Sequence, residues 1–114
     1  MKNNYYLNFL NMLKAFQTSN ALNDLDPTSK LVLEEIALGV AKGELMSVGE
    51  VMRLTSIASP ATLHRKLDVL LEANLIVATF HGNNRRTKFM ALTPQGEQYF
   101  GKLSEVMASI NSAS

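Results

Sequence analysis

Apolar residues recur at helical spacing along most of this chain and alternate with polar residues in only one short region. Residues 5–16 carry an apolar side chain every three or four positions, which predicts a helix with one apolar face. Asp26-Pro27 predicts the start of a second helix, because aspartate caps a helix N-terminus and proline suits the first helical position. This helix is expected to end at Gly43 and to bury Leu31, Leu33, Ile36, Ala37 and Val40.

Two more helices are predicted close together in the middle of the chain. Ser47 and Glu50 have the spacing of a capping box, in which each side chain accepts a hydrogen bond from the other residue's backbone N–H. The helix that follows is expected to break near Thr55. Ser59-Pro60 then opens another helix over residues 60–73, whose buried stripe is predicted to be Leu63, Leu67, Leu70 and Leu71.

A hairpin and a final helix complete the pattern. Asn74 is expected to end the preceding helix, because asparagine tolerates a positive φ angle. Residues 75–80 and 87–92 are predicted to be strands around a polar tip at residues 81–86. Thr93-Pro94 predicts the start of the last helix. The expected fold is mainly α with a small β-hairpin wing, that is, a winged helix-turn-helix.

Composition narrows the class of protein. The 114 residues allow a single domain, predicted to comprise an N-terminal helix in residues 1–20, the winged helix-turn-helix in 26–93 and a C-terminal helix in 94–114. The absence of cysteine excludes disulfides and thiolate chemistry and is typical of a cytoplasmic protein. No apolar run is long enough to span a membrane, and asparagines interrupt the apolar region that a signal peptide would need.

Positive charge is concentrated in one segment. The net charge is only +1, but residues 53–88 hold six basic and two acidic residues, against five basic and eight acidic residues elsewhere. A local basic segment is typical of an anion-binding surface. If the leucine stripe of residues 60–73 is buried, the opposite side of that helix faces solvent, and the hairpin tip adds further cations. The residues predicted to contact DNA are Ser59, Ala61, Thr62, His64, Arg65, Lys66, Arg85, Arg86 and Lys88.

These residue types suit distinct contacts. Ala61 can touch a thymine methyl group, and Arg65 can bind guanine through two hydrogen bonds. Asp68 lies one helical turn from Arg65, where it either orients the guanidinium or forms a surface pair without a role. Arginines at the hairpin tip suit the flanking minor groove.

The order of motifs from about residue 26 to residue 100 resembles the winged-helix core of the MarR family of bacterial transcription regulators. The resemblance rests on Asn74-Leu75-Ile76, on Asn84-Arg85-Arg86 and on Leu92-Thr93-Pro94-Gln95-Gly96, which begins six positions after Arg86. It implies that Arg86 is the wing arginine and that residues 59–66 recognise the groove. The chain departs from the family where Asn84 replaces an acidic residue, where Asn74 replaces glycine, and where one C-terminal helix replaces the usual pair.

The two terminal helices carry more apolar surface than so small a core needs. They are therefore predicted to form a twofold dimer interface, although the alternative that the first helix folds back onto its own domain stays open. A twofold dimer presents two recognition helices about 34 Å apart and reads a roughly palindromic site. The predicted interface residues are Tyr6, Phe9, Leu13, Phe16, Phe100, Leu103, Val106, Met107 and Ile110.

The leading hypothesis is a dimeric, sequence-specific regulator of transcription that binds double-stranded DNA as a repressor, with any small-molecule effector unknown. The alternative is a winged helix that serves as a protein-interaction module, which the modest net charge and the acidic Asp68 and Glu72 on the exposed helix face leave open. No catalytic constellation, metal-ligand cluster or phosphate-binding glycine loop is evident in the sequence. No enzyme activity, metal or cofactor is therefore expected.

Overall fold

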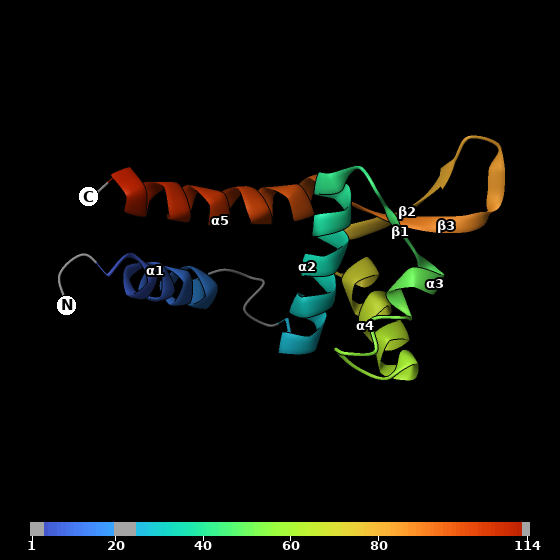
Figure 1. The fold of residues 1–114 in the computed structure, drawn as a ribbon, viewed down its shortest axis with the longest axis horizontal. Helices are drawn as coiled ribbons and strands as arrows, with labels where there is room; N and C mark the ends of the chain where they lie inside the picture. Colours follow the sequence, from blue (N-terminus) through green and yellow to red (C-terminus); the bar gives the residue numbers. More distant parts are fainter. Residues whose placement is uncertain (1–3, 20–24, 113–114) are drawn as a thin grey trace. The chain divides into compact units, whose positions relative to one another are not determined.

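The computed structural model describes residues 4–19 and 25–112, and within them the side chains of residues 4–16 and 25–109. These residues form two compact units, one comprising Asp26–Glu97 and the other joining the first helix with the last helix from Gln98 onward (Figure 1). The elements are α1 (Tyr5–Ser19), α2 (Pro27–Lys42), β1 (Met46–Ser47), α3 (Val48–Val51), α4 (Pro60–Glu72), β2 (Ile76–His81), β3 (Asn84–Leu92) and α5 (Pro94–Ser112).

The predicted helix starts are confirmed by their capping hydrogen bonds. The Asp26 carboxylate accepts from the Ser29 N–H at 2.9 Å. Ser47 and Glu50 form the reciprocal capping box, and this short α3 helix ends sooner than predicted, at Val51. Gly43 ends α2 in the left-handed conformation, with φ of 74°. Local sequence therefore determines where these elements begin, before any long-range packing is considered.

The core of the Asp26–Glu97 unit lies where α2 packs against α4 and the sheet. One predicted core position is wrong: Leu31 is 48% exposed, whereas its neighbour Val32 is fully buried. Residues 32, 33 and 36 share the inward side of α2, and Leu31 falls with Leu38, two turns later, on the outward side. The buried side chains of α2 and α4 are Val32, Leu33, Ile36, Leu63, Leu67 and Leu70.

The sheet contains three antiparallel strands in the order β1-β3-β2. Met46 of β1 pairs with Met90 of β3, which is buried in the core. The predicted six-residue hairpin tip is too long, because β2 continues to His81 and β3 begins at Asn84. Only Gly82, with φ of 55°, and Asn83 lie between the two strands. The basic residues of the tip are thus part of a strand.

The motif Leu92-Thr93-Pro94-Gln95-Gly96 joins the sheet, the end of α4 and the start of α5. The buried Thr93 hydroxyl donates to the Asn74 carbonyl oxygen at 2.7 Å and accepts from the Gly96 N–H at 3.0 Å. A Cβ atom on Gly96 would overlap the Leu75 carbonyl oxygen, so glycine is required for this approach. Asn74 adopts φ of 58°, as predicted for the residue that ends the helix.

In the other unit, α1 and α5 run antiparallel and contact each other within one chain. The rings of Phe16 and Tyr99 lie 6.0 Å apart, and the Ser109 hydroxyl lies 4.0 Å from the Met12 sulfur. Of the predicted dimer residues, Tyr6 and Met107 are the most exposed, at 67% and 56%. The side chain of Ile110 lies outside the described residues. The partly buried members of the predicted set are Phe9, Leu13, Phe16, Phe100, Leu103 and Val106.

Candidate nucleic-acid interface

Burial of the leucine stripe fixes which side of α4 meets solvent. Leu63, Leu67 and Leu70 are at most 3% exposed, so the opposite side of the helix points outward. That side carries Ala61 and Arg65, both exposed, beside the half-buried Thr62. The predicted small, polar and cationic surface is therefore present over the first two turns of α4.

A chain of hydrogen bonds runs along this surface from the helix cap. The Ser59 hydroxyl accepts from the Thr62 N–H at 3.3 Å and donates to the Thr62 hydroxyl oxygen at 3.1 Å. The same Thr62 oxygen accepts from Nη2 of Arg65 at 3.1 Å. Three of the residues predicted to contact DNA are thus joined in one arrangement, a link that the sequence analysis did not foresee.

Asp68 does not orient Arg65, which was one of the two roles considered for it. Its Oδ2 atom lies 3.6 Å from Nδ1 of His64, one helical turn earlier, and both side chains are largely exposed. The pair gains full ionic character only when the histidine is protonated. Thr62 instead accepts the hydrogen bond from Arg65 that Asp68 would have accepted in the first of its two considered roles.

Lys66 is less available for DNA than its place on the helix predicted. Its Nζ atom lies 3.2 Å from Oδ2 of Asp26, and the lysine side chain is only 25% exposed. The Asp26 pKa falls from 3.8 to about 2, chiefly because its carboxylate accepts from the Ser29 N–H and hydroxyl, with a further contribution from Lys66. Lys66 thus ties α4 to the cap of α2.

The wing holds its cations in an irregular part of β3. Thr79 pairs with Phe89 and His81 pairs with Asn84, so one residue of β2 lies opposite four residues of β3. Those four, residues 85–88, include all three cations predicted for the wing, Arg85, Arg86 and Lys88. Such bulges bend a strand and redirect its side chains.

Two contacts support this bulged segment. The Arg85 guanidinium lies over the Phe80 ring, 5.5 Å from its centroid, and His81 stacks on Phe89 with a centroid separation of 4.2 Å. Sequence reasoning did not assign Phe80 and Phe89 this role, although the presence of one phenylalanine on each side of the tip was a usable signal. Aromatic stacking and cation–π contacts of this kind stabilise a hairpin.

Asn84 is the residue that stands in place of the acidic residue expected from the family resemblance. Its side-chain oxygen accepts a hydrogen bond from the Arg86 backbone N–H at 2.9 Å. The amide therefore holds the backbone at Arg86 without placing a negative charge beside the guanidinium.

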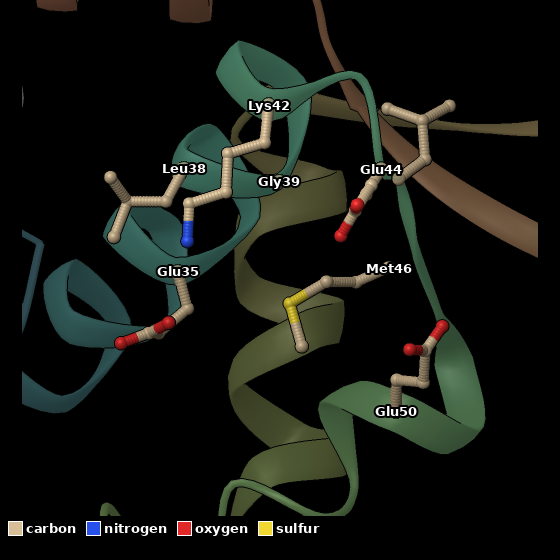
Figure 2. Close-up of a pocket in the computed structure, with 8 residues that line it drawn as sticks. Glu35, Leu38, Gly39, Lys42, Glu44, Met46 and Glu50 are labelled. Atoms are coloured by element: carbon tan, nitrogen blue, oxygen red, sulfur yellow. The ribbon is translucent and has the colours of Figure 1, made fainter.

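A shallow hollow of about 200 Å³ lies between α2, β1 and the start of α3. Figure 2 shows the side chains of Glu35, Glu44 and Glu50 around that of Met46, with Lys42 nearby. Its volume is below the roughly 300 Å³ at which pockets begin to enclose drug-sized ligands.

Across residues 4–19 and 25–112, no three His, Cys, Asp or Glu residues are grouped to bind a metal ion. In the same part of the chain, no helix has the length and apolarity to cross a membrane.

Comparisons of sequence and of structure give different results. The sequence matches no family model and no curated protein. The structure is similar to TM0816, a MarR-like transcriptional regulator from Thermotoga maritima, with a TM-score of 0.65, 21% identity, and coverage of 99% of this chain and 80% of that one. It is also similar to the heme sensor protein PefR from Streptococcus agalactiae, with a TM-score of 0.59, 16% identity, and coverage of 99% and 79%.

A third similar structure is that of RV1404 from Mycobacterium tuberculosis, with a TM-score of 0.61 and 19% identity. The match covers 80% of this chain but spans only 58% of the length of RV1404. The capped helix pair, the α4 leucine stripe and the hairpin described above lie within Asp26–Glu97. This protein has the MarR-like winged-helix fold.

Proposed function

We propose that this protein is a sequence-specific regulator of transcription that inserts α4 into the major groove of double-stranded DNA. The observation that carries the proposal is the N-terminal half of α4, where the exposed Ala61 and Arg65, with the half-buried Thr62 beside them, lie on the side opposite the buried Leu63, Leu67 and Leu70. A helix with this pattern presents contacts for base edges while its other side anchors it to the protein.

The wing supplies the second contact. Arg85, Arg86 and Lys88 are exposed and gathered within the bulge of β3. Arginines carried on a projecting hairpin suit the minor groove, where a narrow groove has an enhanced negative potential. In this arrangement the wing contributes mainly to affinity and groove-width preference, whereas α4 contributes the base readout.

We further propose that the protein acts as a twofold dimer and a repressor on a roughly palindromic site. The supporting observation is the exposed apolar surface of the unit formed by α1 and α5, which includes Tyr5, Tyr6, Leu7 and Met107. Exposed apolar surface of this kind favours association. A dimer that covers adjacent half-sites blocks polymerase access without any further activity.

Charge reversal in each DNA-contacting element tests the proposal. Arg65→Glu and Arg86→Glu are expected to abolish binding in fluorescence anisotropy with the protein's own upstream DNA, while the dimer persists in sedimentation. Lys102→Glu, an exposed site on α5, changes the net charge equally and serves as the control. Wild-type affinity should fall steeply as salt rises, because phosphate contacts release counterions.

Unchanged DNA affinity in both arginine variants would contradict the proposal. Failure of the wild type to bind any duplex at low salt would instead favour the protein-interaction hypothesis, for which the exposed acids Asp68 and Glu72 on α4 are the supporting feature.

A further inference from the structure

We propose that Thr62 is a positioning residue that holds the Arg65 guanidinium ready for base recognition and thereby sets sequence preference. This role rests on the proposed function, because it requires α4 to enter the groove. It goes further by separating two duties on one helix face: Arg65 contacts the base, and Thr62 determines where Arg65 points.

The first step is the contact between the two side chains. Nη2 of Arg65 lies 3.1 Å from Oγ1 of Thr62, three residues earlier on the same face of α4. A guanidinium has N–H donors and no acceptor, so the direction of this hydrogen bond is fixed. This hydrogen bond takes one of the five N–H groups and leaves the paired donors needed to bind guanine.

Thr62 is itself held in place by Ser59. Its side chain accepts from the Ser59 hydroxyl at 3.1 Å, and its backbone N–H donates back to Ser59 at 3.3 Å. A threonine side chain in a helix otherwise divides between two rotamers. The Ser59 contact selects one, so Arg65 is tied through Thr62 to the cap of the helix.

Arg65 had one other candidate partner on the same helix face. Asp68 was the acidic candidate, but it lies against His64. Among the described residues Thr62 is therefore the side chain that fixes the arginine. An arginine held in place loses less conformational freedom on binding than a mobile one. Non-specific contacts with phosphate need no single orientation, so the effect should appear in discrimination between sequences.

The test compares four proteins: the wild type, Thr62→Val, Arg65→Ala and the double variant. Binding is measured by fluorescence anisotropy on the duplex that the wild type enriches most from a random pool, and on a scrambled duplex of the same composition. Thr62→Val is expected to weaken binding to the enriched duplex about two- to tenfold, as for the release of one ordered side chain. Its binding to the scrambled duplex should weaken less than its binding to the enriched duplex.

The double variant distinguishes positioning from a structural effect. If Thr62 acts through Arg65, adding Thr62→Val to Arg65→Ala causes no further loss, whereas a structural effect would add to it. Thr62→Ser keeps the hydroxyl and is expected to restore most of the preference. Thr28→Val makes the same chemical change in the first turn of α2 and should leave DNA binding unaffected.

The possible outcomes separate this inference from the proposed function. Full preference for the enriched duplex in Thr62→Val, or additive losses in the double variant, would overturn the positioning role while DNA binding itself stands. If the wild type enriches no duplex from the pool, the proposed function fails first, and the positioning role fails with it.

Discussion

The Thr93 hydroxyl lies 2.7 Å from the carbonyl oxygen of Asn74 and so joins the start of α5 to the end of α4. The same hydroxyl oxygen accepts from the Gly96 N–H in a buried setting. Thr93→Val keeps the shape but leaves both backbone groups without this partner. We expect the free energy of unfolding, measured by urea denaturation, to fall by about 2–6 kcal/mol, because each of the two groups costs about 1–3 kcal/mol when it is buried without a partner.

Thr79→Val provides the matched control for that change. Thr79 lies in β2, and valine has a good strand propensity. A change of less than about 0.5 kcal/mol is expected there, as is usual for sites away from buried polar contacts. An equal fall in the free energy of unfolding in both variants would mean that the Thr93 contacts do not stabilise the fold.

Replacing two glycines of α5 by alanine, one at a time, should change the stability of the protein in opposite directions. Gly96→Ala places a methyl group against the Leu75 carbonyl oxygen and is expected to cost about 1–3 kcal/mol. At Gly101 no atom of the described residues lies within 4 Å of the place that a Cβ would take, so Gly101→Ala should stabilise the helix by about 0.5–1 kcal/mol. Thermal denaturation should therefore show a lower Tm for the first variant and a higher Tm for the second; the same sign for both would contradict the structure.

Ionisation of Asp26 should make the free energy of unfolding depend on pH in the acidic range. Its pKa is about 2 in the folded protein, below the ordinary value of 3.8, so its stabilising effect is complete above about pH 4. This effect is expected to be lost as the pH falls through the folded pKa, toward pH 2. Asp26→Asn retains a capping side chain but does not titrate, so the free energy of unfolding should vary less between pH 4 and pH 2 than in the wild type.

Lys66→Met tests which contact lowers the Asp26 pKa. The Ser29 N–H is the largest cause, and Lys66 contributes less. The variant should therefore retain most of the acid dependence of the wild type. If the dependence disappears with Lys66, the ion pair is the dominant cause instead.

Dimer formation should depend on exposed apolar residues of α1 and α5. Tyr6→Glu and Met107→Glu each place a carboxylate in the surface proposed to associate, and sedimentation velocity should show monomers in place of dimers. Leu31→Glu, at a similarly exposed apolar position of α2, is the control and should leave the dimer intact. Monomeric wild-type protein at all concentrations would contradict the dimer proposal.

The local sequence predicted the starts of the helices because capping chemistry is confined to a few consecutive residues. Asp26, Ser47 and Ser59 each accept the expected backbone hydrogen bond. The same reasoning failed at Leu31, because an apolar residue next to the buried stripe can lie on either side of it. Only the packing of α2 against its neighbours decides which residues face inward.

The exposed side of α4 was predicted from sequence, but the contacts along it were not. The spacing of the leucines indicates which side of the helix is buried, so Arg65 was expected to be exposed, and it is. The partners of Lys66 and Asp68 were not predicted, because several acids and bases lie within reach of each and only the three-dimensional arrangement selects among them. The three extra residues of β3 could not be predicted either, because strand register is set by pairing across the sheet.

The bulge in β3 makes the length of the wing independent of the strand register nearer the core. Pairing from Ile76–Leu92 to Thr79–Phe89 keeps one register, and the extra residues of β3 lie beyond it. Residues can therefore be gained or lost at the wing during evolution without moving Met90 from the core. Descendants of one ancestral protein can then differ in the length of this hairpin while they keep the same core.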